Sequence, residues 1–395
     1  MDVYKKFYQN VLFALASVLV LTGCSSELVK KTPEQLFEEC ASGVVLICCE
    51  SYYSLTLPTG VTLYMSDIDD EGNAVNLTTD KEVIKENCNH MFGTGFFIDS
   101  KGNILTNRHV VNTFMDENIA KKKIVESLQR ERQTYLDSME MARQAYAELK
   151  EKKNNCYGLD FSGDIYVSNP KLLQEIEVTM DFVEEKYNNW QDLCNFISAN
   201  ANPSAIKIKP HVTIGIAYNN AHIEDFDDFF VSNPCAIHKI SRRENADLAI
   251  IQLKNKQTPK QAHIFDVSGK VMKEKKSKTP GDYVSQVLFG KTPMEEVDAD
   301  VLKMDQQLYM IGYNHGIALA QTREGIKAQM TSGKLTQLPD GERLLYSIPT
   351  MQGSSGSPVF DEDGTLRGVN FAKATLNDDF NFGIPMNLIK NFLKE

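Results

Sequence analysis

The sequence predicts a mainly β fold that is built from antiparallel hairpins and interrupted by an α-helical insertion. Strand–turn–strand patterns occur at residues 93–106 and 359–371, where apolar runs flank turns rich in Asp and Gly. Between them, about residues 115–205 show helical periodicity instead. A chain of 395 residues with 42% hydrophobic content is long enough for two or three domains with real cores.

The N-terminus has the pattern of an export signal. Two lysines precede an apolar run at residues 11–21, which is too short to span a bilayer and is typical of a secretory leader. The run ends in Leu-Thr-Gly-Cys, which resembles a bacterial lipobox. This resemblance implies removal of residues 1–23, lipidation of Cys24 and a tether over residues 24–42. We therefore expect an exported lipoprotein, anchored in a membrane on its periplasmic or cell-surface side. An uncleaved anchor or a buried Cys24 is the alternative.

Three short strings carry residues that together could perform acyl transfer. His109 follows a predicted strand, and Asp247 precedes the apolar run 248–253. A carboxylate at the edge of a buried strand can accept a hydrogen bond from an imidazole while shielded from water. Ser355 lies in a Gly-Ser-Ser-Gly-Ser-Pro string, where Gly353 lets a backbone N–H face an incoming carbonyl oxygen. Such a string alone is usually only a turn, but His, Asp and Ser in this order match one known order of the catalytic triad.

The surrounding sequence strengthens this interpretation. The stretches are GTGFFIDSKGNILTNRHVV, NADLAIIQL, LYMIGYNHG, QMTSGKL, QGSSGSPVFDEDGTLRGVNFA and FGIPMNLIKNFL. In their type and order they resemble a trypsin-like serine protease of the bacterial HtrA/Deg type. The resemblance implies two antiparallel six-stranded β-barrels of the chymotrypsin type. The first would cover residues 43–255 with the helical insertion at 115–205, and the second residues 256–395 with a loop insertion at 268–304.

The same resemblance implies a role for each site residue. Ser355 would be the nucleophile, His109 the general base and Asp247 the group that orients the imidazole. The N–H groups of Gly353 and Ser355 would form the oxyanion hole. The expected substrate pocket is formed by Pro349, Thr350, Met351, Asn370, Phe371 and Ala372. This pocket has no carboxylate at its base, so small or medium apolar side chains are expected before the scissile bond.

The chain also departs from the family pattern. Ser354 stands where digestive relatives have an Asp that pairs with a new N-terminus, so activation by N-terminal cleavage is not expected. Arg108 stands where a small residue is common, and it either contacts substrate or projects from its loop. No PDZ domain is expected after the protease region.

The helical insertion contains two apolar stripes that should face each other as an antiparallel hairpin. One runs from Val125 to Leu149 and the other from Leu173 to Ile197. The hairpin is expected to close on its own seam and to fold semi-independently. Its role stays open between inert decoration and a lid, an oligomerisation arm or a partner-docking arm. Residues 268–304 are expected to form a basic, mobile surface loop.

No cofactor or metal is expected. Beside Cys24 there are seven cysteines, an odd number that leaves at least one thiol without an intramolecular partner, and their spacing fits no zinc pattern. They are Cys40, Cys48, Cys49, Cys88, Cys156, Cys194 and Cys235. The acidic run 67–72 could begin a calcium loop, but Thr78 stands at its twelfth position in place of the required Glu.

The overall charge and the three candidate residues define the expected partners. A net charge of −11 argues against nucleic acid as a partner. Polypeptides are the expected substrates, and the lipid on Cys24 the expected contact with the membrane. The competing hypothesis is a protease-fold protein that binds through its helical hairpin without turnover. Hydrolysis of small esters is a weaker third possibility. The sequence predicts no oligomeric state.

Overall fold

The computed structural model describes residues 31–243, 245–275, 278–290, 292–373 and 381–395. Cys24 and the expected leader lie outside these residues. No helix within the described ranges is both long enough and apolar enough to cross a membrane.

The first barrel closes through six antiparallel strands, with β2 (Thr62–Met65) added beside β1. In ring order they are β1 (Val44–Thr56), β5 (Asn89–Phe97), β6 (Asn103–Thr106), β11 (Ala249–Leu253), β10 (Pro234–Ile240) and β9 (Lys207–Tyr218). The ring closes where β1 pairs with β9, from Val45 opposite Tyr218 to Thr56 opposite Lys207. Successive residues of β1 point to opposite faces, so Val45 and Ile47 enter the barrel core while Val44 and Leu46 face the second barrel.

The second barrel is also a closed ring of six antiparallel strands. In ring order they are β14 (Gln307–Gly312), β17 (Gln329–Gln337), β18 (Leu344–Tyr346), β21 (Asn381–Pro385), β20 (Leu366–Lys373) and β19 (Pro358–Asp361). Alternate residues of β14 divide in the same way: Leu308 and Met310 fill the interior, whereas Tyr309 and Ile311 join the core between the barrels. The fold class predicted from the sequence is confirmed.

Short elements complete the barrels. They are α2 (Pro33–Cys40), η1 (Ala41–Gly43), β3 (Asp67–Ile68), β4 (Ala74–Val75), α3 (Lys81–Glu86), α4 (Arg108–Val111), α7 (Asp227–Ser232), α9 (Ile317–Ala320), β15 (Gln321–Thr322), β16 (Gly325–Ile326) and α10 (Met386–Lys394). The apolar face of α10 covers the core between the barrels with Leu388, Ile389 and Phe392.

Residues 268–304 are not the loop expected from the sequence. They form an antiparallel pair of strands, β12 (Lys270–Glu274) and β13 (Met294–Asp298), with α8 (Pro280–Phe289) between them. These strands do not alternate apolar and polar residues, so the sequence pattern does not predict them. Charged residues pair across the two strands, as in the 3.0 Å ion pair of Lys270 with Glu296. The buried guanidinium of Arg367 binds Asp361 and donates to the carbonyl of Ala299, which ties the end of this insertion to the second barrel.

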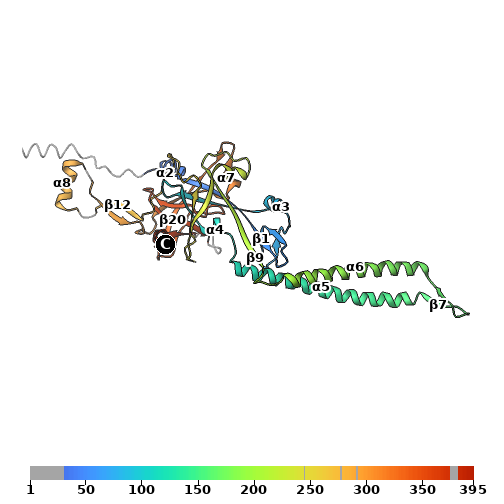
Figure 1. The fold of residues 1–395 in the computed structure, drawn as a ribbon. Helices are drawn as coiled ribbons and strands as arrows, with labels where there is room; N and C mark the ends of the chain where they lie inside the picture. Colours follow the sequence, from blue (N-terminus) through green and yellow to red (C-terminus); the bar gives the residue numbers. More distant parts are fainter. Residues whose placement is uncertain (1–30, 244, 276–277, 291, 374–380) are drawn as a thin grey trace, which may run out of the picture.

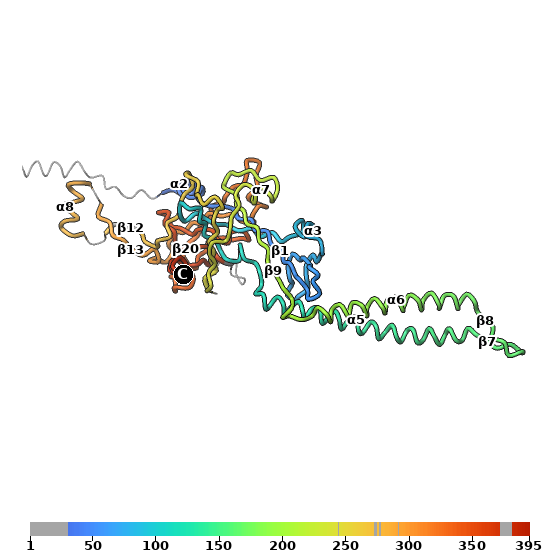
Figure 2. The backbone as a smooth tube through the Cα atoms, in the orientation of Figure 1, coloured from blue at the N-terminus to red at the C-terminus, as the bar shows by residue number. Residues whose placement is uncertain are grey.

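The helical insertion forms a long two-helix arm that extends away from the barrels (Figures 1 and 2). It consists of α5 (Glu117–Asn154) and α6 (Pro170–Asn200), joined at the far end by the small hairpin of β7 (Tyr157–Leu159) and β8 (Ile165–Val167). Asp116 caps α5 by accepting hydrogen bonds from two first-turn amides, and Asn169 caps α6. At ~1.5 Å per residue α5 is roughly 57 Å long.

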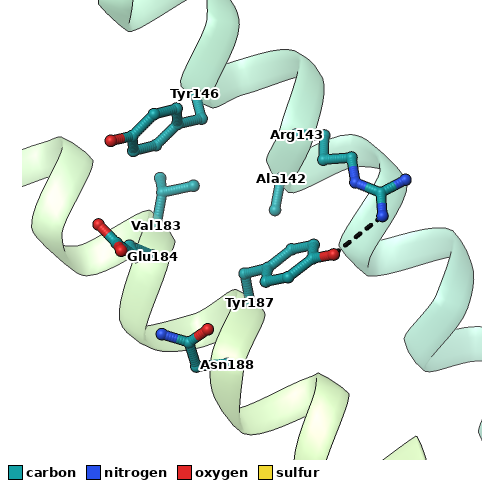
Figure 3. A pocket seen from close by; sticks show the side chains of 7 residues that line it. All are labelled: Ala142, Arg143, Tyr146, Val183, Glu184, Tyr187 and Asn188. Carbon is teal, nitrogen blue, oxygen red and sulfur yellow. Dashed lines mark hydrogen bonds between the residues drawn. The ribbon is translucent and has the colours of Figure 1, made fainter.

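One antiparallel register runs along the arm. Arg132 contacts Ser198 at 2.9 Å, Arg143 donates to the Tyr187 hydroxyl at 2.9 Å, and Lys153 pairs with Glu177 at 2.8 Å. The two residue numbers of each pair add to 330, as a constant register requires. Figure 3 shows the shallow groove around the second pair, where the Arg143 guanidinium also lies over the Tyr187 ring. The buried seam contains Met139, Ala142, Ile176, Met180, Cys194 and Ile197, all members of the two predicted stripes.

The base of the arm is different from its distal part. Ala120, Ile124 and Val125 are buried against Tyr53, Leu55 and Met65 of the first barrel. The expectation of a fully self-contained seam is therefore wrong for the first turns of α5. The end of the arm lies farthest from the barrels and does not cover them (Figure 1).

Candidate active site

His109 is presented by a single helical turn at the end of β6. Its Nδ1 lies 2.5 Å from Asp247 Oδ2, and its backbone N–H donates to Asp247 Oδ1 at 3.1 Å. The Asp247 side chain is 6% exposed and the His109 side chain 43% exposed. The imidazole is thus held through one ring nitrogen, and the pairing leaves Nε2 to act as a base or an acid.

Asp247 is fixed by its own backbone as well as by the imidazole. The buried Asn107 side chain donates to the Asp247 carbonyl at 2.9 Å, and the Arg108 N–H donates to it at 3.1 Å. The Arg108 Nε lies 3.6 Å from Asp247 Oδ1, and its Nη1 donates to the Ser241 carbonyl. Arg108 therefore does not project freely, because its guanidinium rests against the candidate triad carboxylate, and contact of its partly exposed side chain with a substrate stays a prediction.

Ser355 lies on a turn that needs glycine on either side of it. Gly353 has φ +92° and Gly356 φ +88°, in the left-handed region that other residues rarely adopt. A Cβ on Gly353 would lie 2.4 Å from the backbone nitrogen of Gly316, and one on Gly356 would lie 2.1 Å from the Thr94 carbonyl. Among the described residues, neither the Gly353 nor the Ser355 N–H donates a hydrogen bond. Both amides are thus available to a ligand oxygen.

Thr94 of the first barrel joins this turn to the His109 side of the site. Its N–H donates to the Ser355 carbonyl and its hydroxyl to the Gly353 carbonyl, both at 2.8 Å. The Thr106 hydroxyl, three residues before His109, donates to the Thr94 carbonyl at 2.7 Å. The structure therefore brings the Ser355 turn against the strand end that carries His109, although the two are far apart in the sequence.

Two of the residues predicted for the substrate pocket have buried side chains, and one of them, Asn370, supports the turn. Asn370 is 2% exposed; its amide donates to the Ser354 carbonyl at 2.9 Å, and its side-chain oxygen accepts from the Tyr346 hydroxyl at 2.7 Å. Burial raises the pKa of Tyr346, which keeps this donor protonated. Thr350 is buried too and donates to Asn381 at 2.7 Å. Both side chains are thus buried and hydrogen-bonded within the protein, and their part in a substrate pocket stays a prediction.

The other four residues predicted for the pocket differ in exposure. Pro349 and Met351 are exposed. The ring of Phe371 is partly buried, 6.4 Å from that of His109 and 6.1 Å from that of Phe382. The Ala372 side chain lies outside the described atoms, although its backbone pairs with Phe382. No local sequence signal points to the bridging role of Thr94 or to the burial of Asn370.

One comparison with known proteins bears on the family of part of this chain. Residues 233–369 match the family model of a trypsin-like peptidase domain, a segment that contains Asp247 and Ser355 but not His109. This match supports a serine protease. A search of curated proteins found no match. The crystal structure of the serine endoprotease from Yersinia pestis is similar at 13% identity with a TM-score of 0.38, covering 93% of this chain and 66% of that one. The description of the barrels rests on the strand pairings above.

Proposed function

We propose that this chain is a serine endopeptidase that cleaves polypeptides through an acyl-enzyme, with Ser355, His109 and Asp247 as its triad. The observation that carries the proposal is the His109–Asp247 pair at 2.5 Å, on the same barrel as Thr94, which hydrogen-bonds to the Ser355 turn. A serine hydroxyl is a weak nucleophile unless an oriented base takes its proton. The paired carboxylate fixes the tautomer that makes Nε2 the base.

The proposed reaction is acyl transfer to Ser355 and then to water. Ser355 Oγ attacks the scissile carbonyl while His109 Nε2 takes the hydroxyl proton, and Asp247 stabilises the imidazolium that forms. The negative oxygen of the tetrahedral intermediate accepts hydrogen bonds from the Gly353 and Ser355 N–H groups. The imidazolium then protonates the leaving amine, and water releases the acyl group by the same steps. Loss of one such donor typically costs about 3 kcal/mol of transition-state stabilisation.

The primary specificity is proposed to be for small or medium apolar side chains. The support is the apolar character of Pro349, Met351 and Phe371, which lie near the turn and bring no carboxylate. Cleavage of a randomised peptide library tests this directly. Predominance of Lys or Arg before the cut bond would contradict it.

Export and lipid anchoring through Cys24 are proposed on the leader sequence alone. Metabolic labelling with a radioactive fatty acid should mark the wild-type chain and not Cys24→Ser. Equal labelling of both would rule out Cys24 as the acceptor.

A fluorophosphonate probe tests the proposed chemistry, because it bonds covalently only to an activated serine. The wild type should be labelled, Ser355→Ala should not, and Ser204→Ala, which removes an exposed serine elsewhere, should be labelled like the wild type. Circular dichroism verifies that each variant is folded. No labelling of a folded wild type would overturn the proposal and favour a binding protein without turnover. The specific observation behind that alternative is the set of exposed apolar side chains at the end of the arm, Leu159, Phe161 and Ile165 among them.

A further inference from the structure

Three side chains that commonly bind metal ions meet at the edge of the first barrel, away from the Ser355 turn. Glu50 of β1 stands directly opposite His90 of β5 in the strand pairing. Cys88 lies immediately before β5, two residues ahead of His90, and its Sγ approaches the His90 ring. Its thiol is free. The register of two strands thus unites a carboxylate, a thiol and an imidazole from separate parts of the sequence.

The distances between these groups fit one small cation. Cys88 Sγ lies 3.7 Å from His90 Nε2, and the ligand atoms of all three residues lie within 4.8 Å of one another. Tetrahedral zinc, with Zn–S of about 2.3 Å and Zn–N of about 2.0 Å, requires a sulfur–nitrogen separation of roughly 3.5 Å. The observed separation needs little adjustment to meet this value.

The surroundings also favour a cation. The groove over these residues is lined by Glu82, Glu86, Asp225 and Asp227 in addition to Glu50, and by one lysine, Lys85, whose ammonium is already paired with Glu82 at 3.0 Å. Five carboxylates and one ammonium leave a strongly negative groove. The His90 ring stacks on Phe226 with 4.3 Å between ring centres, which holds the imidazole in place.

We propose that Glu50, Cys88 and His90 bind one zinc ion, with water completing the tetrahedron. A thiolate and an imidazole select zinc over calcium or magnesium, which prefer oxygen ligands. Burial and the neighbouring Glu50 carboxylate raise the pKa of the Cys88 thiol to about 12, so the metal-free thiol holds its proton. Zinc replaces that proton, which leaves to solvent as the Zn–S bond forms. The bound ion connects β1 to β5 at His90, which lies four residues before Thr94 on the same strand.

The spacing of cysteines and histidines in the sequence does not reveal this site. Common zinc motifs contain two pairs of ligands that are close in sequence, whereas here Glu50 lies 38 positions before Cys88 and only strand pairing brings the two near. The expectation of no metal depends on local spacing alone.

Titration of the metal-stripped full chain tests the site with a readout independent of peptide cleavage. Cobalt(II) serves as the probe, because a thiolate ligand gives an intense near-ultraviolet charge-transfer band, and zinc should abolish that band at one equivalent. Cys88→Ser should eliminate the band, and His90→Gln should weaken zinc binding at least tenfold. Cys156→Ser, at the far end of the arm, is the matched control and should behave as the wild type.

The wild-type measurement keeps the proposal falsifiable even where a variant fails to fold. Absence of a thiolate–cobalt band in the folded wild type would overturn the proposal. So would equal zinc affinity in Cys88→Ser, or displacement of zinc by an equal concentration of calcium or magnesium. Zinc should also raise the melting temperature of the wild type and leave that of His90→Gln unchanged.

Discussion

The candidate active site around His109 and Ser355 and the arm that leaves the first barrel are stabilised by different means. At the candidate active site, several buried polar side chains have defined hydrogen-bond partners, as Thr94, Asp247 and Asn370 show. The distal arm has only a narrow apolar seam, and its end exposes large apolar side chains. These are Tyr157, Leu159, Phe161, Ile165, Tyr166 and Val167. Single substitutions at the candidate active site should therefore have large effects, whereas the barrels should tolerate deletion of the distal arm.

The largest expected effect is on the catalytic rate at the candidate active site. Asp247→Asn keeps the shape of the side chain but favours the wrong imidazole tautomer, so kcat should fall by about 10⁴-fold, the loss known for this substitution in the Ser-His-Asp template. Initial rates on a peptide substrate measure it, beside Asp181→Asn on the exposed face of α6 as the control. A decrease below tenfold would mean that Asp247 does not act through His109.

An intermediate effect, on the free energy of unfolding, is expected at the base of the arm, where α5 packs on the first barrel. Ile124 is 5% exposed and packs on the first barrel, whereas Ile119, in the same helix, is 52% exposed. Ile124→Ala should lower the free energy of unfolding by about 2–4 kcal/mol, because a buried cavity is left behind. Ile119→Ala should change it by less than about 0.5 kcal/mol. Urea denaturation gives both values, and equal values would show that the base is no part of the core.

The smallest effect on barrel stability and ester turnover is expected from removal of the distal arm. Replacing residues 136–194 with a short Gly/Ser linker cuts both helices beyond the base, where Arg132 still meets Ser198. The barrels should stay folded with nearly unchanged urea stability, since loop closure costs little. Turnover of a small ester should also be unchanged, whereas cleavage of protein substrates should change several-fold if the arm docks them.

A matched deletion sharpens this result. Removing residues 115–205 also removes Ala120, Ile124 and Val125, and should destabilise the first barrel. Unfolding of the shorter deletion as well would mean that the distal helices belong to the core. Unchanged protein cleavage with unchanged oligomeric state would make the arm decoration.

The same contrast explains what the sequence can predict. The strings around His109, Asp247 and Ser355 are local, and the stripes of the arm repeat with a helical period, so both are visible in one dimension. The support of the Ser355 turn is not visible there, because Thr94 and Gly353 are 259 positions apart. The burial of Asn370 is not visible for a related reason, because its contact with Tyr346 depends on the closed barrel.

The hydrogen bonds of Thr94 also bear on when the molecule becomes active. Thr94 belongs to one barrel, and the two carbonyls that it binds belong to a turn of the other. Domains of larger proteins fold largely one at a time, so a chain passes through states in which only one barrel is formed. In those states the Ser355 turn lacks the Thr94 contacts, although it keeps those of Asn370 within its own barrel. For the endopeptidase proposed above, the site would be complete only after both barrels have formed, which would limit digestion of unfolded neighbouring copies during folding.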